Sequence, residues 1–331
     1  MSRHKRTASH AGDWYSDDAD ELDRQLTLWL RDVSEDGYPI PKCKAVIAPH
    51  AGYSYSGPTA AWAYKSIDTR GIKRVFVLGP SHHIYLDGCA LPSESCTAYA
   101  TPLGDLPLDT ETIKELGEIN GTPKFKRLSR KADEDEHSLE MHLPYIRKMF
   151  LGQEIVLVPI MVGAISRDSE ATFGALLAPY LAREDTFTVV SSDFCHWGTR
   201  FQYTYYYPAP GPDAEPVRLS RSTIPDPAHP IHASIRRLDH EAMDLLTLPS
   251  PASPPGTAAD AHTAFVSYLA RTKNTICGRH PIGVLFGALT ALEQQEEAKK
   301  AQVKWVRYAQ SNACESVRDS SVSYASAWVH F

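Results

Sequence analysis

Three short apolar runs, each followed directly by polar side chains, constrain the fold of this chain most strongly. The runs cover residues 45–48, 75–78 and 187–190. A continuous apolar run of this length between turn residues is typical of a strand that is buried on both faces. We therefore predict three buried strands, and we expect them to belong to one sheet.

Side chains that can bind metals or move protons follow each of these runs. His50 follows the first run, His82 and His83 follow the second, and the segment 191–197, with the sequence SSDFCHW, follows the third. We predict a turn at each of these three places. If the strands are parallel neighbours, their carboxyl ends meet at one edge of the sheet, where ligands of α/β proteins bind. The sequence therefore predicts one pocket lined by these turns.

The segments between the strands indicate an α/β fold. Residues 58–67 have a helical pattern and join the first two strands into a β-α-β unit. Residues 137–150 also read as a helix, with Pro144 as a kink or a start point. Two proline-rich stretches, 208–230 and 249–258, lack periodicity and read as surface loops. Strands are predicted on both sides of each loop, so we expect one domain over residues 1–331.

Composition excludes several classes of protein. The net charge of −6 over 331 residues leaves no basic footprint for nucleic acid. The longest apolar run, residues 155–165, contains Pro159 and Gly163 and is too short to span a bilayer. The six cysteines form no C-x-x-C pair, and no apolar segment follows the basic N-terminus. These features favour a soluble intracellular protein with reduced thiols, without a membrane span or a nucleic-acid partner.

His50, His82 and Cys277 are the candidate metal ligands. Neutral imidazole is a common transition-metal ligand, and two histidines at neighbouring strand ends can share one ion. Cys277, in the sequence TICGRHP, would add a thiolate, which favours copper, zinc or iron over magnesium or calcium. Two alternatives stay open. The only role of each histidine can be a hydrogen bond to backbone groups of its turn, and Cys277 can be a buried structural cysteine.

Further polar residues are candidates for the same pocket. Asp193 and His196 stand three positions apart and can form an acid/base pair or orient a metal-bound imidazole; an N-cap in this segment is equally compatible. Arg279 and His280 can line an anion pocket. Tyr55, close to His50, can either stack on a substrate or pack a helix against the sheet.

Residues 137–142, HSLEMH, resemble a metalloprotease motif without matching it. The inverted zincin motif requires H-x-x-E-H, and Met141 separates Glu140 from His142 here. We therefore reject a protease and keep Glu140 and His142 as pocket-wall groups. The sequence G-x-S-x-G of serine hydrolases and phosphate-binding glycine-rich loops do not occur in the chain.

Several motifs together resemble the Memo family, the mediator-of-cell-motility group. The motifs are IAPHAGYSYSG, LGPSHH, DEDEHSLEMHLPY, SSDFCHWG, NTICGRHPIGVL and YAQS with DSSVSYAS. The resemblance implies a fold similar to class III extradiol (non-haem iron) dioxygenases, with a central mixed, largely parallel sheet flanked by helices. It places the family's metal ligands on His50, His82 and Cys277 and its pocket residues on Asp193 and His196.

The resemblance also implies a function. Family members bind iron or copper, rather than zinc, and are redox-active proteins of motility and growth signalling in cytoplasm and nucleus. A thiolate in place of the dioxygenase carboxylate argues against ordinary ring cleavage. The alternative is a non-catalytic adaptor that binds a phosphotyrosine peptide or a signalling protein in the same cleft. Whether the chain is an enzyme stays open at this point. If it is an enzyme, we expect a metal-dependent oxidoreductase.

Overall fold

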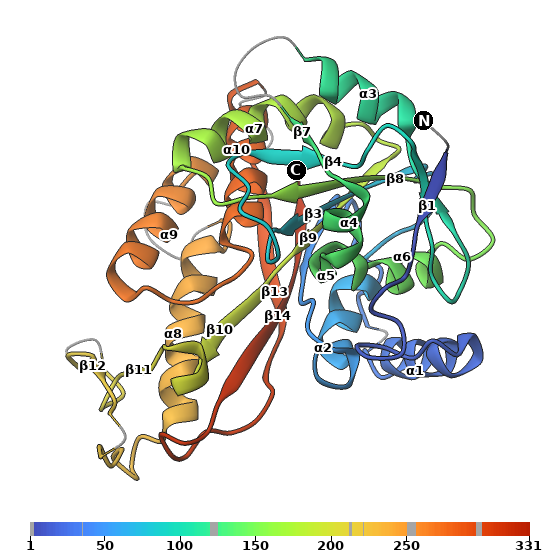
Figure 1. Ribbon diagram of the computed structural model, residues 1–331. Helices are drawn as coiled ribbons and strands as arrows, with labels where there is room; N and C mark the ends of the chain where they lie inside the picture. The colour runs from blue at the N-terminus through green and yellow to red at the C-terminus, as the bar shows by residue number, and fades with distance from the viewer. Residues whose placement is uncertain are drawn as a thin grey trace.

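The computed structural model describes residues 3–34, 36–119, 125–211, 214–220, 222–249, 256–295 and 300–331. Its largest sheet has nine strands, and helices lie on both faces of it (Figure 1). The strands are β1 His4–Arg6, β2 Ala45–Ala48, β3 Arg74–Pro80, β4 Cys89–Leu91, β5 Cys96–Tyr99, β6 Leu106–Pro107, β7 Lys126–Arg127, β8 Val156–Val162, β9 Thr186–Ser191, β10 Asp193–Trp197, β11 Tyr205–Tyr206, β12 Val217–Arg218, β13 Gln302–Gln310 and β14 Ser321–His330. The helices are α1 Ala19–Arg31, α2 Tyr53–Lys65, α3 Thr110–Glu118, α4 Arg130–Asp135, α5 His137–Glu140, α6 Leu143–Met149, α7 Arg167–Leu181, α8 Ile231–Leu246, α9 Ala258–Thr272 and α10 Arg279–Gln295.

The centre of the large sheet is parallel and its margins are mixed. The order is β10-β14-β2-β9-β3-β8-β4-β7, with β13 paired to β14. Strands β2, β9, β3 and β8 run parallel to one another, whereas β14 is antiparallel to β2, β10 and β13, and β4 is antiparallel to β8. The predicted α/β class, with a mixed and largely parallel central sheet, is confirmed.

Helices cover the two faces of the sheet because its central strands are apolar on both sides. Figure 1 shows α7 to α10 on one side and α1, α2, α5 and α6 on the other. Every residue of β2 and β9 is buried. Buried apolar side chains of the described residues join one continuous cluster that includes both ends of the chain, from Tyr15 to Val329. This cluster is compatible with one domain, and the single-domain organisation stays a prediction.

Two predicted elements have different bounds in the structure. Helix α2 begins at Tyr53 rather than at residue 58, because the backbone N–H of Tyr53 is held by the carbonyl of Trp14 and the early turns pack on α1. Segment 191–197 is not a turn but contains β10, because β14 offers it an antiparallel partner. An N-cap in this segment is therefore wrong, since a strand and not a helix follows Ser192.

The remaining differences concern irregular segments. Residues 137–150 form two short helices, α5 and α6, and Pro144 lies in the first turn of α6, where its missing N–H costs nothing. The stretch 208–230 contains β12, which pairs with β11. Residues 250–255 of the second proline-rich stretch lie outside the described residues.

Candidate metal centre

The ends of three adjacent strands bring the predicted metal ligands together. His50 follows β2 and His82 follows β3, and β9 lies between these two strands in the sheet. Cys277 lies just before α10 and reaches the same point, with its Sγ 3.2 Å from the Nε2 of His50. One ligand atom from each of these three residues lies within 4.8 Å of the other two. The arrangement is compact enough to hold one metal ion.

Hydrogen bonds fix the tautomer of His50 so that its Nε2 is free. Nδ1 lies 2.6 Å from Ser191 Oγ, and the Ser191 hydroxyl donates its only proton to the carbonyl of Ser138 at 2.8 Å. Nδ1 must therefore carry the proton, which leaves the Nε2 lone pair directed at Cys277. Burial, with the nearby His82 and His137, holds the pKa of His50 well below its ordinary value, so the ring is neutral.

The carboxylate of Glu136 holds Nδ1 of His82, as the hydroxyl of Ser191 holds Nδ1 of His50. It accepts the backbone N–H of His82 at 2.6 Å and lies 2.8 Å from Nδ1 of the same ring. Burial alone would raise the pKa of Glu136, but hydrogen bonds from His82 and electrostatic interactions with the His82 and His137 rings lower it to about 2. An ionised Glu136 accepts a hydrogen bond from Nδ1–H of His82 and leaves Nε2 of the ring for a metal, as carboxylates do behind metal-bound histidines.

Cys277 completes a donor set that fits a thiophilic transition metal. Burial and the neighbouring Asp193 raise the pKa of the Cys277 thiol well above its ordinary value. A metal ion can displace this proton, since metal-binding cysteines are thiolates. Two neutral imidazoles and one thiolate suit copper, iron or zinc, whereas magnesium and calcium prefer oxygen ligands. The residues present therefore fit the predicted kind of site.

Asp193 and His196 lie beside these ligands on β10. Asp193 is buried, and its Oδ1 accepts the backbone N–H of His50 at 2.8 Å, so it holds the turn that presents His50. Nδ1 of His196 lies 2.9 Å from the carbonyl oxygen of Phe194 and 3.1 Å from that of Thr275. This contact leaves Nε2 of His196 for the pocket.

A cavity of about 570 Å³ opens beside the centre. Tyr55 lies in its wall and is 61% exposed, as expected of a residue at the mouth. The lining comprises Trp14, His50, Ala51, Gly52, Tyr55, His82, His137, Asp193, His196, Arg200, Phe201, Ser311, Asn312, Ser320, Ser321, Val322 and Tyr324. The pocket thus combines the metal-ligand histidines with aromatic rings, small hydroxyl side chains and one arginine.

His137 is the main site residue that sequence reasoning missed. Its ring stacks on His82, with centroids 4.4 Å apart, and also contacts Trp14 at 4.5 Å. Burial and the His82 ring lower the pKa of His137 to about 3. His82, Glu136 and His137 form a second group whose donor atoms lie within 4.8 Å of one another. The available signal was the position of His137 directly after Glu136 in the acidic motif.

Two residues that we expected in the pocket wall lie beneath it instead. Glu140 is fully buried and bonds Arg6 at 2.6 Å, so it anchors the N-terminus of the chain. His142 is also fully buried, and its Nδ1 lies 2.8 Å from the hydroxyl of Tyr64. The break between α5 and α6 turns both side chains into the interior.

Three further candidates lie outside the cavity's lining. His83 is exposed, although its Nε2 lies 3.4 Å from Nδ1 of His137. Arg279 donates to the carbonyl of Ile276 at 3.3 Å, and His280 lies with Nδ1 2.6 Å from Glu170. Arg279 and His280 border a separate cavity of about 260 Å³. They begin α10, whose first turn carries them away from Cys277 and toward α7.

A larger cavity lies away from the candidate metal ligands. It measures about 1250 Å³ and is bordered by α8, the tyrosines of the β11 segment and the loop that follows them. Neither group of potential metal ligands found among the described residues lies in its wall. The chemistry of the site is therefore concentrated in the smaller pocket at the strand ends.

Comparison with known proteins establishes the family. A family model described as "Memo-like protein" matches residues 6–328. The chain belongs to the Memo-like family. It is 44% identical to mouse Protein MEMO1 and 43% identical to the human protein over 322 residues, covering 97% of this chain and 95% of each relative. It is 39% identical to the Caenorhabditis elegans Protein memo-1 homolog over 326 residues, which covers 98% of this chain and 83% of that protein.

The structure of this Memo-like protein also has a solved neighbour. A crystal structure of an uncharacterized Escherichia coli K12 protein superposes with a TM-score of 0.51 at 15% identity, covering 87% of this chain and 99% of that one. At this identity the likeness concerns the fold alone. Within the described ranges, none of the helices of the Memo-like chain combines the length and apolar character that crossing a membrane requires.

Proposed function

We propose that this Memo-like protein binds one iron or copper ion through His50, His82 and Cys277 and that it is redox-active. One observation carries the proposal: both histidines hold Nδ1 on a partner, Nε2 of His50 lies 3.2 Å from the sulfur of Cys277, and a ring nitrogen of His82 lies within 4.8 Å of the same sulfur. A structural histidine in a turn needs no such arrangement. Two imidazoles and a thiolate favour iron or copper over harder cations.

The residues around the ligands support chemistry in the adjoining pocket. A bound iron or copper ion would supply one-electron redox chemistry beside the cavity. Asp193 holds the His50 turn, and His196 presents an Nε2 that can accept or donate a proton at the cavity wall. The protein is then a metal-dependent oxidoreductase. We do not propose ring cleavage, because a thiolate replaces the carboxylate of the dioxygenase ligand set.

A second candidate function is binding of a phosphotyrosine peptide without catalysis. Arg200 lies in the cavity wall together with the aromatic rings of Trp14, Tyr55 and Phe201. An arginine beside aromatic side chains can bind a phosphorylated aromatic group. In this case Arg200 takes the role first considered for Arg279. A signalling role in cytoplasm and nucleus belongs to both candidates.

Metal analysis of the purified protein tests the first proposal. We expect about one iron or copper per chain in protein prepared without added metal, and almost none in His50→Ala or Cys277→Ser. Cys96→Ser and His240→Ala serve as controls, because neither residue belongs to the groups of potential ligands. If the wild type stays metal-free after anaerobic loading with Fe(II) and Cu(I), the proposal is wrong.

Peptide titration separates the two candidates. A phosphotyrosine peptide is titrated into the protein before and after removal of metal by a chelator, and again into Arg200→Gln. Equal affinity before and after removal, combined with loss of binding in Arg200→Gln, favours the peptide-binding pocket. Metal-dependent oxidation of a test reductant, without peptide binding, favours the oxidoreductase.

A further inference from the structure

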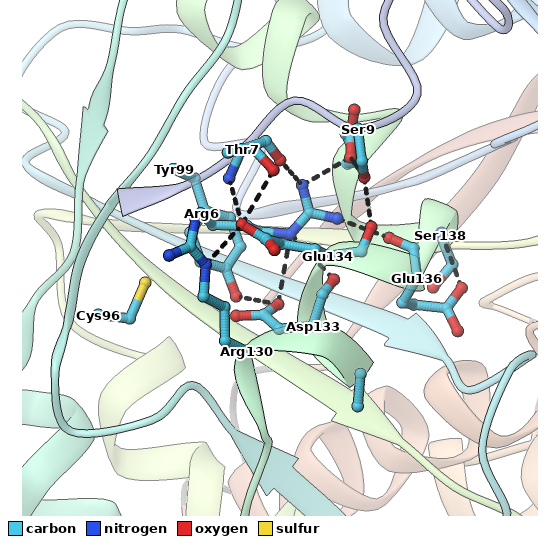
Figure 2. A network of polar contacts seen from close by, with 12 residues as sticks. Arg6, Thr7, Ser9, Cys96, Tyr99, Arg130, Asp133, Glu134, Glu136 and Ser138 are labelled. Atoms are coloured by element: carbon cyan, nitrogen blue, oxygen red, sulfur yellow. Dashed lines mark hydrogen bonds and ion pairs between the residues drawn. The ribbon is translucent and has the colours of Figure 1, made fainter. Parts of the chain in front are cut away.

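The N-terminal arm, residues 3–16, is anchored by a buried arginine. Strand β1 in this arm pairs with β5, and the side chain of Arg6 is only 1% exposed. Figure 2 shows Arg6 beside the segment that carries Asp133 and Glu136. Arginine is almost never fully buried unless its charge is paired, so its environment needs an explanation.

Arg6 donates hydrogen bonds to the carboxyl end of α4. Its Nε donates to the carbonyl oxygen of Asp133 at 3.0 Å, and its Nη2 donates to that of Glu136 at 2.8 Å. The last carbonyl groups of a helix have no partners within the helix, and a cation at this end also interacts favourably with the helix dipole. Arg6 therefore fixes the backbone where α4 ends and α5 begins.

The remaining contacts leave Arg6 little freedom. Nη1 donates to Glu140 Oε2 at 2.6 Å, and the Asp133 carboxylate lies 3.4 Å from Nε. The hydroxyl of Tyr99 donates to the same Asp133 carboxylate at 2.7 Å (Figure 2). The planar fork of the guanidinium thus bonds backbone and carboxylates at the same time, a geometry that the point charge of lysine cannot reproduce.

Glu136 connects this anchor to the metal centre. Its backbone carbonyl accepts from Arg6, while its carboxylate accepts the backbone N–H groups of His82 and Ser138 and lies 2.8 Å from Nδ1 of His82. Glu136 is fully buried. A shift of its backbone would therefore move the group that sets the orientation of the His82 ring.

We propose that Arg6 is a positioning residue for the metal ligand His82 and that it acts through Glu136. The expected effect on metal binding rests on the proposed metal site. The positioning of the His82 ring by Arg6 and Glu136 does not depend on a bound metal. Lys5 offers an internal comparison: it stands next to Arg6 on β1, but its ammonium group pairs with Asp105 at the exposed surface. The ammonium group of Lys5 donates to this surface carboxylate rather than to a carbonyl group of α4.

The test compares Arg6→Lys with the matched control Lys5→Met. In metal-free protein, NMR measures hydrogen exchange of the His82 amide and the signal of the His82 Nδ1 proton, with the Val189 amide of β9 as an internal reference. We expect Arg6→Lys to speed exchange at His82 by about 10-fold relative to Val189, and to weaken iron or copper binding by about 10-fold. Lys5→Met should leave both within about twofold.

The outcomes separate this inference from the proposed function. If the wild type binds no metal, the metal proposal fails, while the exchange and Nδ1 signals of His82 still decide the role of Arg6. If exchange at His82 changes no more than at Val189 and the Nδ1 signal stays, Arg6 has a merely structural role and the inference is overturned. If Arg6→Lys does not fold, the double variant Arg6→Met/Glu140→Gln, which removes the buried cation together with a paired carboxylate, undergoes the same two measurements.

Discussion

The metal centre and a second histidine cluster use their imidazole rings in different ways. In the second cluster, which we call the Glu170 cluster, His262 Nε2 and His280 Nδ1 lie 2.7 and 2.6 Å from the two oxygens of Glu170. Both imidazoles converge on one carboxylate. At the metal centre, His50 and His82 instead hold Nδ1 on separate partners, and Nε2 of His50 lies 3.2 Å from Sγ of Cys277.

The Glu170 cluster is built for packing. It joins α7, α9 and α10, and Gly283 faces the Glu170 carboxylate with no room for a Cβ, so the helices approach closely there. Burial would raise the pKa of Glu170, but hydrogen bonds from His262 and His280 lower it, which keeps the group ionised. The comparison teaches that the convergence of ligand atoms from His50, His82 and Cys277 within 4.8 Å of one another, rather than burial or the number of histidines, marks the candidate metal ligands.

The largest expected effect comes from changing the sulfur ligand. We predict that Cys277→Asp lowers the affinity for Cu(I) relative to Fe(II) by about 100-fold or more, because a carboxylate is a harder ligand than a thiolate. Competition with colorimetric chelators measures both affinities under anaerobic conditions. Unchanged relative affinities would show that Cys277 does not bind the metal.

The next largest effect should be on the stability of the fold rather than on metal binding. Glu170→Ala removes the shared partner of two histidines, and we expect it to lower the free energy of unfolding by about 3 kcal/mol. Urea unfolding measures this loss, with the exposed Glu115→Gln as a control that should change stability by less than about 0.5 kcal/mol. The folded variant should contain as much metal as the wild type. If it also lost metal, the claim that the Glu170 cluster plays no part in metal binding would be wrong.

The pH dependence of stability sharpens the same comparison. Because the pKa of Glu170 is lower in the folded protein than its ordinary value of 4.5, its ionised form stabilises the fold above that pH, and this contribution is lost as the pH falls below it. The wild type should therefore lose more stability than Glu170→Gln between pH 6 and pH 3. Urea unfolding measures the free energy of unfolding of both proteins across this pH range. If Glu170 were not responsible for the loss, the two plots of this free energy against pH would run parallel.

The smallest effect is expected at the neighbour of a ligand. His83 is exposed and lies outside the cavity wall, so His83→Ala should change stability by less than about 0.5 kcal/mol. Its metal affinity should stay within about twofold of the wild type, whereas His82→Ala should lose the metal. Isothermal titration with the chosen metal compares the two variants, and equal losses would mean that the wrong histidine has been assigned.

Much of the site's outline was predictable because apolar runs predict strands and strand ends converge. The turns with His50 and His82 follow from that rule, while Cys277 was a candidate for its thiolate chemistry and was matched to a ligand position by the family resemblance. The rule fails for Arg279 and His280, since the start of α10 after Cys277 turns its first residues to another face. Because these residues follow Cys277 closely in the sequence, we predicted them in the wrong pocket.

Contacts between distant segments were not predictable from local patterns. Trp14 reaches the pocket only because the N-terminal arm folds back on α5, and the anchor for that arm is the buried pairing of Arg6 with Glu140. β10 forms because β14, far along the chain, offers it a partner. In each case the decisive interaction joins residues more than a hundred positions apart, where periodicity carries no information.

X-ray absorption spectroscopy of the iron- or copper-loaded protein tests the central claim most directly. The account predicts one sulfur scatterer at about 2.3 Å together with nitrogen scatterers at about 2.0 Å, and loss of the sulfur shell in Cys277→Ser. A spectrum with only nitrogen and oxygen neighbours in the wild type, or a sulfur shell that persists in Cys277→Ser, would contradict the site of His50, His82 and Cys277.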